Sequence, residues 1–193
     1  MTDLDGPVGS LLSDTDATVL RGALQTVRTR GLTSHEKAVT SLLAHKDEWV
    51  RQEALQAIGM LEFSKATKKV AALLKDKKRD VREAALSTLT RLKAAEYASE
   101  FVSFLSDTHT GSAWAAVDAV TMAGQKVSDA ELLKVLVKCM TRAPFDPLPV
   151  IEVLVRLKRL SVKGAMEKLL KKHTAHAGDL ATYFKRLELA VPR

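Results

Sequence analysis

Several residue types on which many folds and catalytic sites depend are scarce in this chain of 193 residues. Cys139 is its single cysteine, so the chain cannot form an internal disulfide or supply the cysteine pairs of a zinc site. Aromatic residues make up 5% of the sequence, and nine glycines and five prolines are few for the turns of a β-sandwich or barrel. No apolar run approaches the roughly 18 residues of a membrane span, and the acidic N-terminal segment does not resemble a signal peptide. These absences predict a soluble cytoplasmic protein that has no metal, cofactor or membrane partner.

Leucine, alanine, valine and lysine are abundant instead, which favours helices. The net charge of +7 is distributed unevenly along the chain. Residues 1–47 carry a net −1, residues 48–93 carry +5, residues 94–155 carry −4 and residues 156–193 carry +7. Two basic blocks therefore flank an acidic one, and we expect their charges to lie on folded surface because no extended basic tail is present.

The sequence repeats itself with a period of 31 residues. Residues 80–89 read DVREAALSTL, and residues 49–58 read WVRQEALQAI. The same step relates further columns of apolar residues: Ala23, Ala54, Ala85 and Ala116; Leu24, Leu55, Leu86 and Val117; Val27, Ile58, Leu89 and Val120; Val39, Val70 and Phe101; Leu42, Leu73 and Phe104; Leu43, Leu74 and Leu105. After small shifts the last three columns continue at Leu133, Leu136 and Val137, and at Met166, Leu169 and Leu170. Such a period predicts an array in which each unit buries its apolar face on the next.

Each unit is expected to hold two helices, because its apolar residues recur at helical spacing. The predicted first helices cover 17–29, 48–61, 79–92, 112–123 and 148–159, and the predicted second helices cover 34–45, 65–75, 96–106, 129–141 and 162–173. Thr33 with Glu36, and Ser128 with Glu131, have the spacing of a capping box, and Ser64 and Ser161 stand where an N-cap is needed. Asp146 before Pro147 has the order of an N-cap and a first helical residue.

Two-helix units of this length with the motif D-x-V-R-x-x-A resemble HEAT repeats, in particular the short bacterial type known from phycobilin lyases. The resemblance rests on Val50, Arg51, Ala54, Leu55, Ile58, Gly59, Asp80, Val81, Arg82, Ala85, Leu86 and Leu89. It implies an all-α, right-handed α-solenoid that forms one domain over 1–193, with a partial unit at 1–16, regular units at 17–126, less regular units at 127–177 and a capping helix at 178–190. It also implies that Arg51 and Arg82 bond to aspartates along the stack, and that the second helices line the concave face.

Few residues suggest catalysis. His35 and Glu36 form a single His-Glu pair, whereas the HEAT-type hydroxylases that hold iron use several such pairs. The repeat register places Trp114 and Asp118 at polar columns of one helix, one turn apart. This pair resembles the Trp-x-x-x-Asp pair of HEAT-like alkylpurine DNA glycosylases, and it is the basis of an alternative prediction of DNA binding or glycosylase activity. The other interpretation of Trp114 is that it covers the adjacent unit or anchors a protein partner.

Basic residues recur at the polar positions of the predicted second helices and in the turn at 75–80, and a surface lined in this way attracts acidic partners. The prediction is a non-enzymatic scaffold that binds a protein with acidic segments, with nucleic acid as the alternative partner and a lyase-like chaperone for a tetrapyrrole protein as a third class. The predicted contact residues are Lys37, Lys68, Lys69, Lys75, Lys77, Lys78, Arg79, Trp114, Lys134, Lys138, Lys168, Lys171 and Lys172.

Overall fold

The structure is a computed structural model that describes residues 5–141, 146–162, 164, 165, 167, 168 and 185. The chain divides into two compact units, Met1–Ala94 and Ala95–Arg193, which are considered separately below. Within the described ranges the secondary structure consists of α-helices and short 3-10 helices, without a strand.

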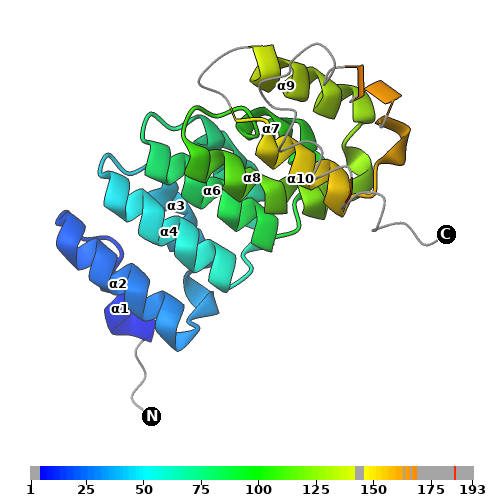
Figure 1. The fold of residues 1–193 in the computed structure, drawn as a ribbon. Helices are drawn as coiled ribbons and strands as arrows, with labels where there is room; N and C mark the ends of the chain where they lie inside the picture. The colour runs from blue at the N-terminus through cyan, green and yellow to red at the C-terminus, as the bar shows by residue number, and fades with distance from the viewer. Residues whose placement is uncertain (1–4, 142–145, 163, 166, 169–184, 186–193) are drawn as a thin grey trace. The chain divides into compact units, whose positions relative to one another are not determined.

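The first unit begins with α1 (Asp5–Leu11), which packs on the first long helix, α2 (Ala17–Arg30). Three first helices, α2, α4 (Glu48–Met60) and α6 (Arg79–Arg91), lie side by side, α4 between the other two (Figure 1). The second helices are α3 (Glu36–Ser41), between the 3-10 helices η1 (Thr33–His35) and η2 (Leu42–Ala44), and α5 (Thr67–Ala72), between η3 (Ser64–Ala66) and η4 (Leu73–Lys75). Each packs on the first helix that follows it, α3 on α4 and α5 on α6.

The second unit contains α7 (Ala98–Phe104), which follows η5 (Ala95–Tyr97), and α8 (Thr110–Ala123), which leads into η6 (Gly124–Lys126). It continues with α9 (Asp129–Thr141), α10 (Leu148–Arg156) and η7 (Leu160–Val162). Helix α7 packs on α8 and on α9, while α10 packs on the same two helices. The second helices α7 and α9 are therefore direct neighbours within this unit.

The first-helix columns predicted from the 31-residue period form the core, whereas Leu73 and Leu133 in the second-helix columns are half-buried. Ala54, Ala85 and Ala116 are each 0% exposed, and the leucine, valine and isoleucine columns beside them are also buried. Alanine at these positions lets neighbouring first helices approach closely, and the aliphatic side chains fill the layer between them. A larger residue in the alanine column would overpack that layer, a change that typically destabilises a core by about 1–3 kcal/mol.

The turn before each of four first helices is closed by the same local bond. The side chain of Asp14, Asp76 or Asp107 accepts the backbone N–H two residues further on at 2.8 Å, and His45 Nδ1 accepts the corresponding N–H at 3.1 Å. Side chains of this kind stabilise turns by bonding to their own backbone. The start of each of these four first helices is thus fixed in part by a bond within its own turn.

The end of the first helices follows a second recurrent pattern. Gly31, Glu62, Lys93 and Lys158 have left-handed backbone with φ of 69°, 54°, 54° and 52°. The next residue in each case donates its N–H to a carbonyl oxygen five residues back, at 3.0 or 3.1 Å. This is the Schellman arrangement, which satisfies carbonyl groups at a helix end. Its recurrence at Lys158 continues the repeat beyond the regular 31-residue columns.

Some of the predicted boundaries are wrong. The second helices of the first unit are shorter than predicted, because 3-10 turns replace their first and last turns. Thr33 and Glu36 do not form a capping box, since η1 leads directly into α3 and the α3 N-cap, His35, makes no side-chain cap bond. Ser64 likewise does not act as a cap but begins η3, which has no side-chain cap bond.

The capping box of Ser128 and Glu131 is confirmed. Glu131 N–H donates to Ser128 Oγ at 3.2 Å, and Ser128 N–H donates to the Glu131 carboxylate at 3.1 Å. Asp146 accepts the N–H of Leu148 at 2.8 Å, but the N-cap of α10 is Pro147, so the predicted order of N-cap and first helical residue is shifted by one position. The apolar register of α9 is shifted, because Val137 is 39% exposed while Cys139 is buried. Met166, Leu169, Leu170 and the predicted capping helix at 178–190 lie outside the described residues, apart from Lys185.

Candidate partner-binding site

Four lysines on the second helices of the first unit are exposed. Lys37 lies on α3, Lys68 and Lys69 lie on α5, and Lys75 ends η4. None of them forms an ion pair with another residue of the described ranges. Their ammonium groups therefore contribute positive charge that no neighbouring carboxylate in that part of the chain neutralises.

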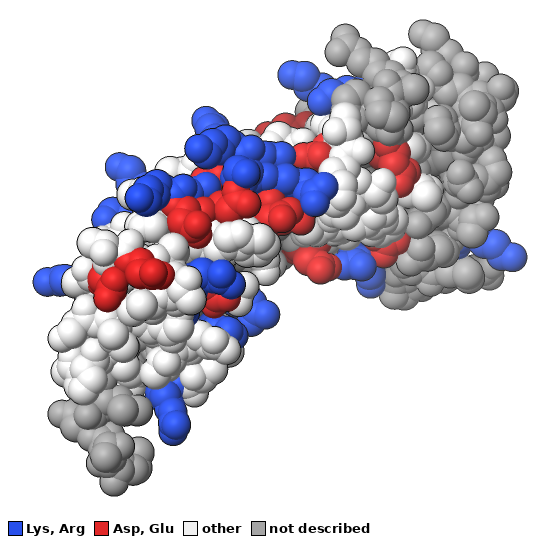
Figure 2. Space-filling view, turned by 90° about the vertical axis from the view of Figure 1, so that its left-hand side faces the viewer, with Lys and Arg blue, Asp and Glu red and all other residues white. Residues whose placement is uncertain are grey.

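The turn that follows η4 is different, because its basic side chains are paired. Lys78 Nζ lies 2.6 Å from Glu48 Oε2 on α4, and hydrogen bonding to this carboxylate raises the pKa of Lys78. Arg79 lies 3.2 Å from Asp80 and 3.7 Å from Glu83. Figure 2 shows a face of the molecule on which Lys and Arg side chains gather directly beside Asp and Glu side chains. Of the basic residues predicted to contact a partner in this turn, Lys77 is exposed, while Lys78 and Arg79 have acidic neighbours of their own.

Arg51 has a structural position, as the resemblance implied. Its guanidinium group donates two hydrogen bonds to the Asp76 carboxylate at 2.9 and 3.0 Å, and two more to the carbonyl oxygens of His45 and Lys46. The side chains of Arg51 and Asp76 are 6% and 8% exposed. Arg82 donates to the carbonyl oxygen of Asp76 at 3.0 Å. The Arg51 bonds join α4 to the turn before α6 and occupy its guanidinium group, whereas Arg82 bonds a backbone carbonyl of that turn and not an aspartate carboxylate.

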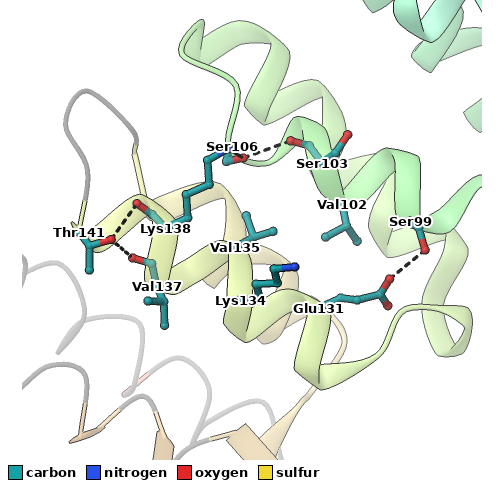
Figure 3. Close-up of a pocket in the computed structure, with 10 residues that line it drawn as sticks. All are labelled: Ser99, Val102, Ser103, Ser106, Glu131, Lys134, Val135, Val137, Lys138 and Thr141. Carbon is teal, nitrogen blue, oxygen red and sulfur yellow. Dashed lines mark hydrogen bonds between the residues drawn. The ribbon is translucent and has the colours of Figure 1, made fainter.

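Between α7 and α9, the second unit contains a groove with a volume of about 540 Å³ (Figure 3). Side chains at helical spacing on each helix face the groove. From α7 these are Ser99, Val102 and Ser103, from the turn after α7 it is Ser106, and from α9 they are Glu131, Lys134, Val135, Val137, Lys138 and Thr141.

Hydrogen bonds between the two helices mark both ends of the groove. Ser99 Oγ donates to Glu131 Oε1 at 2.8 Å, and Lys138 Nζ donates to Ser106 Oγ at 2.9 Å. Hydrogen bonds from Ser128 and Ser99 lower the pKa of Glu131, which keeps its carboxylate charged at neutral pH.

The centre of the groove is open and basic. Lys134 is exposed on α9, and no residue of the described ranges is its hydrogen-bond or ion-pair partner. Val102 and Val135 supply apolar surface from the two helices (Figure 3). The structure thus brings Lys134 and Lys138, both predicted as contact residues, into one groove.

The sequence analysis did not identify Ser99, Ser106 or Glu131 as residues of this site. Both bonded pairs are separated by 32 positions along the chain, which is close to the repeat period, so pairing polar residues of consecutive second helices could have found them. Among the predicted residues further along the chain, Lys168 is exposed, whereas Lys171 and Lys172 lie outside the described residues.

Trp114 and Asp118, the residues of the alternative prediction, lie on the first helix α8, and Trp114 is 37% exposed. Asp118 Oδ1 accepts a hydrogen bond from Arg156 on α10 at 2.7 Å, and Arg156 also bonds Glu152 at 2.9 Å. The carboxylate of Asp118 thus has a structural partner, which links α8 to α10.

Cys139 does not offer a reactive thiol, because burial raises its pKa to about 11. In the described part of the chain, no group of three or more His, Cys, Asp or Glu side chains could hold a metal ion. None of the helices there combines the length and the apolar composition needed to cross a bilayer.

Comparison with known proteins agrees with this architecture. Residues 7–90 match the family of HEAT repeats. No match is found among curated proteins.

Solved structures with the same fold include natural and designed repeat proteins. A designed armadillo repeat protein in complex with the peptide (KR)4 has 19% sequence identity and a TM-score of 0.67, over 95% of this chain and 98% of that one. The complex of CpcE and CpcF of phycocyanin lyase from Nostoc sp. PCC7120 has 17% identity and a TM-score of 0.63, over 86% of this chain and 69% of that one. An engineered protein has 17% identity and a TM-score of 0.66, over 98% of this chain and 95% of that one. Residues 7–90 are therefore similar to HEAT repeats, within a chain that has the fold of an α-solenoid.

Proposed function

We propose that this chain is a non-enzymatic scaffold that holds acidic segments of a protein partner on its second-helix surface. Each unit has its own such surface, the exposed side of α3 and α5 in the first unit and that of α7 and α9 in the second. The inter-repeat turns lie at the edge of each surface and extend the contact.

The observation that carries the proposal is the unequal pairing of charges. Several basic residues of the first helices and of the turn at 76–79 have acidic neighbours, as in the pairs Arg28–Glu53, Lys78–Glu48 and Arg156–Asp118, although Arg30 and Lys77 have none among the described residues. By contrast, the second-helix lysines Lys37, Lys68, Lys69, Lys75 and Lys134 have no ion pair with another described residue. Unpaired charge of one sign on one surface favours association with a partner of the opposite sign, in rate and in selectivity.

The structures with the same fold support this kind of function by analogy. The designed armadillo protein is in complex with the strongly basic peptide (KR)4, and CpcE is in complex with CpcF. On this chain the second helices carry lysine, so that the complementary peptide is acidic. Lysine suits general electrostatic attraction, because it lacks the two-pronged geometry by which arginine fixes a particular carboxylate.

The proposal is tested by capturing partners from the native lysate with the full chain and identifying them by mass spectrometry. In the test variant, Lys68→Glu and Lys69→Glu reverse two charges on α5. The matched control reverses two charges at the ends of first helices, with Arg30→Glu and Lys93→Glu. We expect proteins with acidic segments to be lost from the test variant and retained by the control, and their cross-links to fall on second-helix lysines.

Equal capture by both variants would contradict the proposal. So would capture that disappears on nuclease treatment, because the chain would then be binding nucleic acid rather than protein.

A further inference from the structure

We propose that a pocket on the first helices of the first unit binds a phosphate monoester, the group carried by a phosphorylated side chain or by a small phosphate ester. The pocket has a volume of about 340 Å³ and is formed by α2, α4 and α6, which lie side by side (Figure 1). None of its lining residues belongs to the second-helix surface, so this inference does not rest on the proposed function.

Two arginines reach this pocket from the two helices that flank α4. Arg28 of α2 has its Nη1 atom 3.5 Å from the Sδ atom of Met60 on α4. Arg91 of α6 crosses the adjacent residue of α4, since a Cβ atom built on Gly59 would lie 3.3 Å from Arg91 Cδ. Glycine at position 59 therefore leaves the space in which the Arg91 side chain lies.

Neither guanidinium group is held by a strong acceptor. A thioether sulfur is a weak acceptor, and the Arg28 Nη2 atom is 3.8 Å from Glu53 Oε2, which is beyond hydrogen-bond distance. Arg91 is exposed and forms no hydrogen bond or ion pair with another described residue. An oxyanion can therefore bond to Arg91 without displacing a partner, and it offers Arg28 a better acceptor than sulfur.

The electrostatic environment of the pocket is positive. Its lining residues include both arginines but no aspartate or glutamate, and Glu53 beside Arg28 offsets one of the two charges. Carbonyl groups at the ends of helices carry partial negative charge, but the residues that follow α4 and α6 donate hydrogen bonds to carbonyl groups there. The charge of Arg91 is thus left without a counterion among the described residues.

A phosphate monoester fits these groups better than a carboxylate does. It carries a charge of about −1.5 to −2 at neutral pH, and its three terminal oxygens can accept from donors on different sides. Gln56 and Ser87 are exposed at the pocket and provide neutral donors beside the arginines. Met60 is 53% exposed and provides apolar surface for the carbon atoms that carry the phosphate.

The test is an NMR titration of the isotope-labelled full chain with the phosphoserine form of the peptide GASAG, its unphosphorylated form, the glutamate analogue GAEAG and phenyl phosphate. We expect the phosphoserine peptide to shift resonances in the last turns of α2, α4 and α6, and to bind about fivefold more tightly than GAEAG. Its affinity should rise as the pH is raised through about 6, where a phosphate monoester loses its second proton. The unphosphorylated peptide should shift none of these resonances.

Phenyl phosphate distinguishes the two sources of the group. If it binds as tightly as the phosphoserine peptide, the ligand of the pocket is a small phosphate ester, whereas tighter binding of the peptide indicates a phosphorylated protein. Both outcomes support the inference, because the group that is recognised is the same.

Arg91→Gln should weaken the binding of the phosphoserine peptide about tenfold, because a charge-assisted hydrogen bond is lost. Arg91→Lys should weaken it about threefold, since lysine keeps the charge but lacks the two-pronged geometry. The matched control, Arg30→Gln, removes the same charge from an exposed arginine that does not line the pocket, and should change the affinity less than about twofold at physiological ionic strength. The spectrum of each variant without ligand reports whether its fold is intact.

The inference is wrong if the phosphoserine peptide and GAEAG bind equally, or if the shifts fall on the second helices α3 and α5 instead. It is also wrong if Arg91→Gln and Arg30→Gln have the same effect, because the phosphate would then be attracted by the general surface charge and not by this pocket.

Discussion

Removal of the Asp76 carboxylate is expected to destabilise the first unit more than any change at its surface. Asp76→Ala leaves the guanidinium group of Arg51 with hydrogen bonds only to the carbonyl oxygens of His45 and Lys46. The Arg51 side chain is 6% exposed, so water cannot readily replace the lost carboxylate. Breaking a buried ion pair by removing one partner typically lowers the free energy of unfolding by about 3–5 kcal/mol.

Part of the lost free energy of unfolding comes from the hydrogen bond that Asp76 accepts within its turn. A matched variant measures that part. Asp14 accepts the N–H of Asp16 just as Asp76 accepts that of Lys78, both at 2.8 Å, but no arginine bonds Asp14 within the described residues. Asp14→Ala should therefore cause a much smaller loss. The difference between the two variants reports the buried ion pair itself.

Urea denaturation followed by far-ultraviolet circular dichroism gives the free energies. The double variant Arg51→Met with Asp76→Ala should recover part of the loss, because an apolar side chain of similar length leaves no buried charge. If Asp76→Ala lowered the free energy of unfolding no more than Asp14→Ala, the reasoning about this pair would be refuted.

Three further outcomes follow from the same structure. Burial acts to raise the pKa of Asp76, but hydrogen bonds from Arg51 and from the Lys78 N–H outweigh it and lower the pKa. The stability that this carboxylate contributes is therefore present above its unfolded pKa of about 3.9 and is lost as the pH falls through the folded pKa. Asp76→Asn removes this titration, so the decrease of Tm at acid pH should be less steep in the variant. Cys139, with a pKa of about 11, should react slowly with an alkylating reagent near neutral pH and rapidly once urea unfolds the chain, as mass spectrometry would measure. Thr88 Oγ1 donates to the buried carbonyl oxygen of Leu55 at 3.0 Å, and Thr88→Val should lower the free energy of urea unfolding by about 1 kcal/mol through the contact between α4 and α6.

The sequence predicted the first helices and the core well, because both depend on a period that is visible in the residues themselves. Ala54, Ala85 and Ala116 recur at one step and are all completely buried. The second helices were harder to predict. Whether a turn such as Thr33–His35 is α-helical or 3-10 depends on how the chain enters the packed layer, and Thr33 and Glu36 have the spacing of a capping box in either case.

The groove between α7 and α9 was predicted only in part, for a related reason. Exposed lysines can be recognised from the repeat register, and Lys134 and Lys138 were found in this way. The hydrogen bond between Ser99 and Glu131 at the end of the groove depends on how α7 and α9 pack against each other. The repeat register within one unit does not describe that packing. The pairing of Asp118 with Arg156 was missed for the same reason, since these residues lie on different first helices.

The residues with left-handed backbone at the ends of the first helices are positions at which the thermal stability of this chain can be increased. Gly31 and Gly124 adopt positive φ freely, but Glu62, Lys93 and Lys158 hold their side chains in a conformation that is unfavourable by about 1 kcal/mol or more. These three residues are exposed, and none lines the groove between α7 and α9. Replacing them with glycine would thus raise the melting temperature without altering a buried side chain or a groove residue, so that heat resistance could be adjusted independently of the groove.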